Sequence, residues 1–323
     1  MATYKGIHGT KIQNYTSDPA NPLVGEVWFN ATASTLKVNT GALVGAWATG
    51  GALNTGRSDL AGCGTQTAAL AFGGKNDSNN PTTNTELYNG TNWTEVNDLG
   101  TSKYSMGGIG ISTAALTFGG FNPAASPFRL AQTETWNGTN WTEVDDLTSA
   151  RGNISGAGTN TAGLAFAGGN PGITNSTKLT ELWNGSNWTE VNDLNTGRDG
   201  VGAAGTSTAA LAFGGDPSPA GQTELWNGTN WTEVNDLNTT RSNLGGAGIS
   251  TAALAFGGSV SPQAQTETWN GTNWTEVADL NVARQKLAGG GTNTVAIAFG
   301  GTSTPTATEE WNIIGGIKTI GTS

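Results

Sequence analysis

Residues 230–258 read NWTEVNDLNTTRSNLGGAGISTAALAFGG, and this stretch decides the fold because it recurs along the chain. Within it, Trp231 is followed ten residues later by Arg241, and Phe256 comes fifteen residues after the arginine, just before two glycines. Six copies keep this spacing, starting at Trp47, Trp93, Trp141, Trp188, Trp231 and Trp274, with Lys103 in one arginine position. Successive arginine positions are 43 to 48 residues apart. A fixed period of this length indicates a repeat architecture.

Each repeat contains the signals of four short strands. In TAALAFGG, Leu254 and Phe256 fall on one face and the alanines between them on the other, which is the period of a strand. Between this run and the next repeat lies E-x-W-N-G-T-N, in which Asn-Gly predicts a hairpin turn because both residues accept a positive φ. The Gly- and Ala-rich segment after each arginine suits a strand whose neighbours approach closely.

Four strands in each unit of 43 to 48 residues are typical of a propeller blade. A helical solenoid is excluded because no 3.6-residue apolar period is present. The order of arginine, a strand ending in Gly-Gly, E-x-Tyr/Trp and a tryptophan resembles the kelch repeat over roughly residues 45–314. It departs from common kelch repeats in using Trp where Tyr is usual. The resemblance implies an all-β fold, a six-bladed kelch-like β-propeller with four antiparallel strands per blade.

The repeat boundaries also predict how such a propeller closes. A copy of the fourth strand is present at Trp47, before the first arginine, whereas the last repeat ends at Trp311 with no later tryptophan. We therefore expect an N-terminal strand near Trp47 to complete the last blade, which removes an open sheet edge. The alternative is that Ile317 to Ile320 supply that strand.

Residues 1–44 precede the repeats, so the expected organisation is an N-terminal segment, 1–44, and a propeller, 45–323. The run GEVWFN at 25–30, followed by TLKV at 35–38, predicts a hairpin. This phrase resembles short segments of bacteriophage tail-fibre and other virion proteins. The resemblance implies a virion structural protein in which residues 1–44 attach to the particle. The other reading is a strap that braces the propeller.

Charge and hydropathy argue against several classes of function. The formal net charge is -10 with only 14 Lys and Arg, which disfavours binding to nucleic acid. No run approaches the 18 or more apolar residues of a membrane span, so no membrane insertion is expected. The N-terminus lacks the apolar region of a secretory signal. We expect a virion protein, synthesised in the host cytoplasm without such a signal.

The repeated polar residues are interpreted as structural. Carboxylates such as Glu224, Glu233 and Asp236 recur in every complete repeat, whereas a catalytic pair is a single asymmetric arrangement. Asp236, five residues before Arg241, suits a turn or an ion pair. An enzyme would need a polar cluster unique to one face, and the sequence shows none. We therefore expect no catalytic residues and no enzyme activity.

The chain also has few residues that hold metals or act as nucleophiles. It contains one histidine, His8, and one cysteine, Cys63, so we expect neither a metal nor a cofactor. Cys63 stands where other repeats have alanine, which predicts a small buried side chain. The recurring tryptophans are expected to fill the space between adjacent blades, because Trp buries a large area.

The repeats differ most in the loops between their second and third strands. Three of these loops are long, at Lys75–Thr85, Phe121–Thr133 and Asn170–Thr180, and in a propeller they share one face. Binding residues concentrate on loops held by a rigid scaffold. The candidate binding residues are Asp77, Asn79, Phe121, Phe128, Arg129 and Lys178.

These observations predict a non-enzymatic phage virion component, such as a tail-fibre, tip or decoration protein. Its partners would be a host-surface glycan, other virion proteins, or both. The alternative is a free kelch-type scaffold for protein–protein interaction.

Overall fold

The computed structural model describes residues 12–19, 26–169, 176–217, 220–259 and 264–320. The chain divides into two compact units, Met1–Ala46 with Ile313–Ser323, and Trp47–Asn312. Within the described residues there is no helix long and apolar enough to cross a membrane. The fold is all-β.

Five four-stranded antiparallel sheets follow one another along the chain, each pairing its strands in sequence order. Sheet 1 has β4 (Ala61–Thr65), β5 (Ala68–Phe72), β6 (Thr85–Tyr88) and β7 (Trp93–Val96). Sheet 2 has β8 (Gly107–Ile111), β9 (Ala114–Phe118), β10 (Thr133–Trp136) and β11 (Trp141–Val144). Sheet 3 has β12 (Ser155–Gly158), β13 (Gly163–Phe166), β14 (Thr180–Trp183) and β15 (Trp188–Val191). Sheet 4 has β16 (Gly202–Thr206), β17 (Ala209–Phe213), β18 (Thr223–Trp226) and β19 (Trp231–Val234), and sheet 5 has β20 (Gly245–Ile249), β21 (Ala252–Phe256), β22 (Thr266–Trp269) and β23 (Trp274–Glu276).

Sheet 6 combines strands from both ends of the sequence. Its strands lie in the order β1 (Gln13–Tyr15), β2 (Val27–Asn30), β3 (Thr35–Thr49), β26 (Thr308–Ile320), β25 (Val295–Phe299) and β24 (Ala288–Gly291). The predicted N-terminal hairpin is therefore present as β2 and β3, with Trp28 opposite Lys37. Its second strand is longer than expected and continues through Trp47 beside β26. The alternative segment, Ile317 to Ile320, lies within β26 itself.

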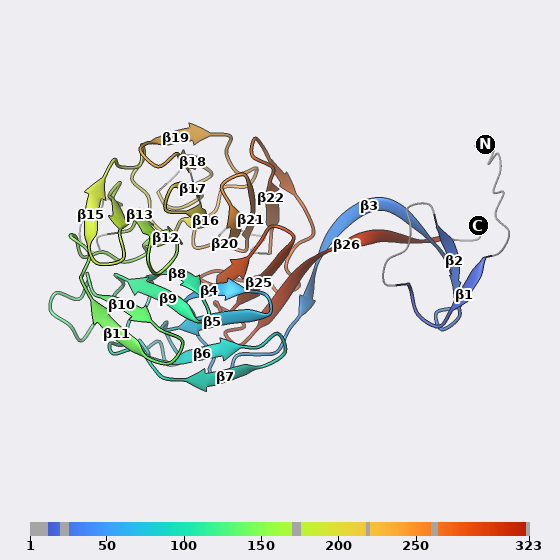
Figure 1. Cartoon of the computed structure of the whole chain (residues 1–323), viewed down its shortest axis with the longest axis horizontal. Coiled ribbons are helices and arrows are strands. Elements are labelled where there is room, and N and C mark those ends of the chain that lie inside the picture. Colours follow the sequence, from blue (N-terminus) through green and yellow to red (C-terminus); the bar gives the residue numbers. More distant parts are fainter. Residues whose placement is uncertain (1–11, 20–25, 170–175, 218–219, 260–263, 321–323) are drawn as a thin grey trace. The chain divides into compact units, whose positions relative to one another are not determined.

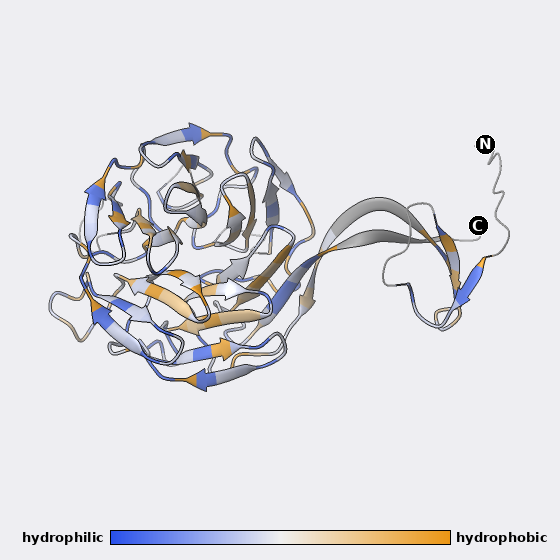
Figure 2. Cartoon of the chain, viewed as in Figure 1, coloured by the Kyte–Doolittle hydropathy of each residue, from blue (hydrophilic) through white to orange (hydrophobic). Residues whose placement is uncertain are grey.

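The repeated sheets are arranged like propeller blades. In Figure 1 the sheets surround a common centre, with the first strands of the repeats, such as β4, β8 and β16, on the inside. Figure 2 shows hydrophilic residues on the outer strands, such as β7 and β19. The prediction of four antiparallel strands per repeat is confirmed for sheets 1 to 5, including the hairpin that places Trp269 opposite Trp274, whereas sheet 6 has six strands.

The predicted tryptophan packing between sheets is also confirmed. Trp231 of sheet 4 meets the ring of Phe166 of sheet 3 edge-on at 4.9 Å and donates to Thr180 Oγ1 at 3.0 Å. Glycine on the inner strand makes room for the phenylalanine of the preceding sheet. A Cβ on Gly108 would lie 2.7 Å from the Phe72 ring, closer than real Cβ atoms come.

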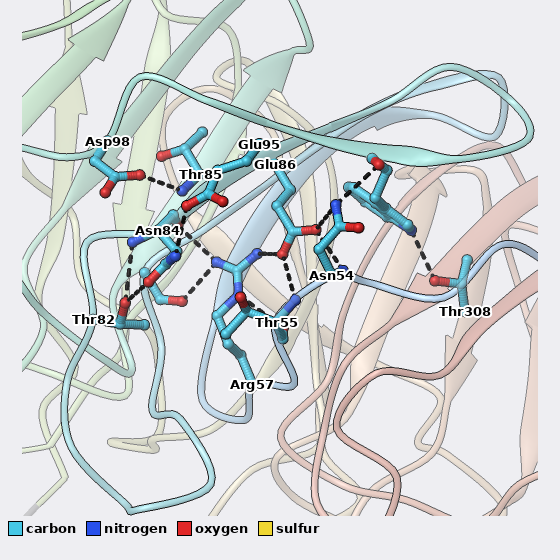
Figure 3. A network of polar contacts seen from close by, with 12 residues as sticks. Asn54, Thr55, Arg57, Thr82, Asn84, Thr85, Glu86, Glu95, Asp98 and Thr308 are labelled. Atoms are coloured by element: carbon cyan, nitrogen blue, oxygen red, sulfur yellow. Dashed lines mark hydrogen bonds and ion pairs between the residues drawn. The ribbon is translucent and has the colours of Figure 1, made fainter.

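Each repeat also contains one buried ion pair. Arg57 Nη2 lies 2.9 Å from Glu86 Oε1, with both side chains almost fully buried, and Figure 3 shows the guanidinium pointing at that carboxylate. The partner of the arginine is thus the glutamate of the third strand. In repeat 4, Asp236 Oδ1 instead accepts a hydrogen bond from the Thr223 amide. Asp236 therefore bonds to the backbone at the start of β18, and neither the expected turn nor an ion pair with Arg241 is observed.

Cys63 is buried as predicted, and burial raises the pKa of its thiol to about 12. It lies opposite Leu70 in sheet 1, in the position that alanine occupies in other repeats. A thiol with so high a pKa is not a nucleophile at neutral pH.

Candidate functional site

In each repeat the first strand begins, and the second strand ends, at the same face of the sheets. A cavity opens at this face among the repeats. Its volume is about 170 Å³. Every repeat lines it with the segment that starts two residues after the arginine position. The loops between second and third strands start beside the cavity, since Ser58 pairs with Lys75 and Tyr104 pairs with Phe121 in short β-bridges.

Six residues, here called the mouth residues, line the cavity at the second position after each arginine or Lys103. They are Asp59, Ser105, Asn153, Gly200, Asn243 and Lys286. All six have a left-handed backbone with φ between 50° and 61°. This conformation costs a non-glycine residue roughly 1–2 kcal/mol and is easiest for Asn and Asp.

Backbone hydrogen bonds between neighbouring repeats accompany this strained conformation. The amide of Ser105 donates to the Asp59 carbonyl at 2.7 Å, and the amide of Asp59 donates to the Lys286 carbonyl at 3.0 Å. The second of these bonds joins the first repeat to the last. Because the backbone is held by the scaffold, the side chains at these positions are free to differ between repeats.

A second set, the outer pairs, surrounds the mouth residues. Each pair joins the residue directly after the arginine position to a residue at the start of the following loop. The pairs are Ser58 with Lys75, Tyr104 with Phe121, Gly152 with Gly169, Asp199 with Asp216, Ser242 with Ser259, and Gln285 with Thr302. No two pairs have the same chemistry, although the surrounding scaffold is nearly identical.

Repeats 1 and 2 contribute aromatic and cationic side chains. Lys75 Nζ lies 4.1 Å from the centre of the Tyr104 ring, and Tyr104 packs on Phe121 with their centres 5.5 Å apart. Phe128 stacks on Phe121 at 5.8 Å, and the guanidinium of Arg129 lies over Phe128 at 5.6 Å. Phe128 is exposed, so this cluster presents an aromatic surface to solvent.

Repeats 3, 4 and 5 contribute acids and hydroxyls. Asp199 and Asp216 exchange backbone hydrogen bonds, both of 2.9 Å. Ser176 Oγ donates to Asp199 Oδ2 at 2.9 Å, and Ser242 Oγ donates to Asp216 Oδ2 at 2.5 Å. Burial raises the pKa of the Asp199 carboxyl, the hydrogen bond from Ser176 opposes this, and the charge of Asp216 raises it further.

This acidic cluster is unique to one repeat. The sequence alone showed no such cluster, because Asp199 and Asp216 are seventeen residues apart and meet only through the pairing of their strands. Two glycines separate it from the aromatic cluster. A Cβ on Gly152 would lie 2.3 Å from the Phe121 ring, and one on Gly169 would lie 2.7 Å from Asp199 Oδ2.

Repeats 6 and 1 form a charged corner around Asp59. Lys286 Nζ lies 3.2 Å from Asp59 Oδ1, and Lys75 Nζ lies 4.0 Å from Asp59 Oδ2. Ser105 Oγ also donates to Asp59 Oδ1 at 3.2 Å. Two ammonium groups thus share one buried carboxylate, and this corner has a net positive charge.

The structure brings together half of the predicted candidates. Phe121, Phe128 and Arg129 form one cluster, as described above. Asp77 and Asn79 are exposed on the first long loop, where Asn79 has a φ of 61° in a turn held by Asn76. Lys178 is exposed on the third loop, part of which lies outside the described residues.

Sequence reasoning missed the mouth residues and most of the outer pairs. The sequence signal that identifies them is a change of residue type at the same position of otherwise near-identical repeats.

Among the described residues, no group of three or more His, Cys, Asp or Glu side chains is placed to hold a metal ion. The chain matches no known family model, and no curated protein is detectably similar to it in sequence.

Proposed function

We propose that this chain is a non-enzymatic binding protein built on a six-bladed kelch-type propeller. Its ligand face is the cavity mouth together with the long loops, and its ligand is a host-surface glycan or another virion protein. The observation that carries the proposal is the set of outer pairs. Their side chains change in every repeat, whereas the buried ion pairs and tryptophans change in one repeat each, at Lys103 and Tyr88.

Several contacts between the first and last repeats support ring closure. Trp93 of sheet 1 donates to Thr308 Oγ1 of sheet 6 at 3.0 Å, the same contact that Trp231 makes with Thr180. On the other side of sheet 6, Trp47 donates to Thr266 Oγ1 at 3.0 Å. Sheet 6 thus contacts sheets 1 and 5 through the same contacts that join the consecutive sheets.

The proposed site of action is the virion. Support comes from the N-terminal GEVWFN phrase and from the division of the chain, since Met1–Ala46 belongs to a compact unit apart from Trp47–Asn312. This unit would attach the chain to a particle, and the second unit would present the ligand face. Mass spectrometry of purified particles should detect the chain, and its consistent absence would remove the virion from the proposal.

Binding is tested with labelled full-length chain on bacterial surface polysaccharides and whole cells. A control variant shortens the three long loops to the length found in repeat 4. Loop-dependent binding to polysaccharide is the expected result. Binding that survives loop shortening would exclude the loops, and loss of saccharide chain length during incubation would show an enzyme instead.

A further inference from the structure

We propose that the cavity mouth is a subsite for one acidic sugar residue, a saccharide ring that carries a carboxylate or a phosphate. This inference rests on the proposed function and names the ligand class of that face. It depends on three features of the mouth, namely its size, its polar lining and the positive charge around Asp59.

The size of the cavity favours a small ligand. At about 170 Å³ it is smaller than the ~300–1,000 Å³ of pockets that enclose drug-sized molecules. It therefore suits a single ring with its substituents. Leu60 and the equivalent residue of every other repeat are among its lining residues, and their side chains are buried, so the exposed lining is mainly polar.

The lining favours a ligand rich in hydroxyl groups. Asn153 and Asn243 present side-chain amides at the mouth, and Ser105 presents a hydroxyl. Beyond them, Asp199 and Asp216 each already accept a hydrogen bond from a serine hydroxyl, which is the kind of donor that a sugar offers. The exposed ring of Phe128 provides an apolar surface at the edge of the loop face.

The charges favour an anionic substituent on one side. Lys75 and Lys286 share the single carboxylate of Asp59, so the corner retains positive charge, and both ammonium groups are partly exposed. Asp199 and Asp216 lie two or more repeats away from Asp59 and Lys286 and outside the cavity lining. A sugar acid would direct its anionic group to Lys286 and its hydroxyls to the side chains of Asn153 and Asn243, which line the cavity.

Lys286 is the residue on which the test depends. It has a φ of 58°, a conformation that asparagine adopts more easily than lysine. Lys286→Asn therefore removes the charge without adding backbone strain. Lys37→Asn makes the same change of charge in β3, in the other compact unit and outside the cavity lining, and serves as the matched control.

The experiment is calorimetric or NMR titration of the full-length chain with glucuronic acid, glucose 6-phosphate, glucose, inorganic phosphate and a hexaglutamate peptide. The two acidic sugars should bind about tenfold or more tightly than glucose, which is the scale of one hydrogen bond to a charged group. Lys286→Asn should abolish this preference, and Lys37→Asn should leave it unchanged. Added salt should weaken the acidic sugars most.

Three outcomes would overturn the inference. Equal affinity for glucose and the acidic sugars would remove the charge requirement and leave the proposed binding function intact. Inorganic phosphate or hexaglutamate binding as tightly as the sugars would show an anion or acidic-peptide site. No saccharide binding to the chain, in this titration or on polysaccharides, would reject both the subsite and the glycan ligand.

Discussion

At the residue scale, Lys103 is the exception among the buried cations. Its Nζ lies 3.0 Å from Glu134 Oε1, and burial lowers the pKa of this lysine. An arginine in the same position makes additional hydrogen bonds, because Arg198 Nη1 also donates to the carbonyls of Gly214 and Gln222. Lysine has no such planar fork of donors.

We therefore expect Lys103→Arg to stabilise the protein by about 1 kcal/mol, the net contribution of an added hydrogen bond. Denaturant unfolding measures the change. The reciprocal variant, Arg198→Lys, should lower stability because it leaves two buried carbonyls with fewer partners. A loss of stability in Lys103→Arg would show that the site is too small for a guanidinium.

A second exception at this scale is Ala167, which has a φ of 60° where the other repeats have glycine. At the equivalent Gly214, an added Cβ would lie 2.5 Å from the Arg241 carbonyl oxygen and 3.0 Å from Leu244 Cδ2, so the leucine is one of two close contacts. Ala167 instead packs in a cluster with Val201, which is smaller than leucine. The alanine and the valine compensate for each other.

We expect Val201→Leu alone to cost about 1–3 kcal/mol through overpacking. Val201→Leu combined with Ala167→Gly should recover most of that loss. A double-mutant cycle in denaturant measures the coupling. Additive single effects would mean that the two side chains do not compete for space.

At the element scale, the hairpin turns join neighbouring sheets. Asn235, at the end of β19, donates to Thr272 O at 3.0 Å and to Asn273 Oδ1 at 2.8 Å in the turn of the next sheet. Asn97 and Asn192 make the same two contacts. The equivalent residue after β23 is Ala278, which precedes a sheet where β26 and β3 are not joined by such a turn.

Asn235→Ala should therefore lower stability by about 1 kcal/mol, because two hydrogen bonds between sheets are lost and water replaces them in part. Ala278→Asn should give no gain, since no equivalent turn accepts its amide. Thermal or denaturant unfolding distinguishes the two variants. A gain in Ala278→Asn equal to the loss in Asn235→Ala would contradict this account.

At the scale of the whole molecule, the N-terminal strand contributes to sheet 6. Trp47 is buried, packs on Phe256 at 5.1 Å and accepts, through its carbonyl, a hydrogen bond from Asn281. We expect Trp47→Ala to cost about 3–5 kcal/mol, as for a large buried side chain, and Trp231→Ala to cost a similar amount. Deletion of residues 1–56 should abolish cooperative melting. A soluble, cooperatively melting deletion variant would refute closure by this strand.

The contact between the first and last repeats uses side chains that the other contacts between repeats do not have. Tyr88 replaces the tryptophan of the other repeats, and its hydroxyl donates to Glu310 Oε1 at 2.7 Å. Gln66, buried in the turn between β4 and β5, donates to the carbonyls of Ala296 and Trp311. These residues differ from their counterparts, so they favour pairing of the two terminal repeats over slipped pairings of identical ones.

Tyr88 gives this contact a pH dependence. Burial, reinforced by the hydrogen bond to Glu310, raises the pKa of its hydroxyl to about 12 from 10.0. The folded state therefore keeps a proton that the unfolded chain loses, so this stabilisation is complete below pH 10 and is lost as the pH rises towards 12. Tyr88→Phe should show a smaller loss of stability over that window. Identical pH profiles for the two proteins would contradict the shift.

The sequence by itself determined the repeat, the four strands of each unit and the burial of the tryptophans and Cys63. These follow from local pattern, because strand period, hairpin turns and apolar content are properties of neighbouring residues. Phe121, Phe128 and Arg129 were also found from sequence, since they lie in one unusual loop.

Only the tertiary structure decided which residues meet at the cavity. Asp59 and Lys286 are separated by most of the chain, and Asp199 meets Asp216 only because two strands pair beneath them. The partner of each buried arginine was likewise hidden, because the nearer aspartate accepts a backbone hydrogen bond from the third strand of its own sheet and the more distant glutamate forms the ion pair. Strand pairing between sequence-distant residues sets these contacts, and no local pattern encodes it.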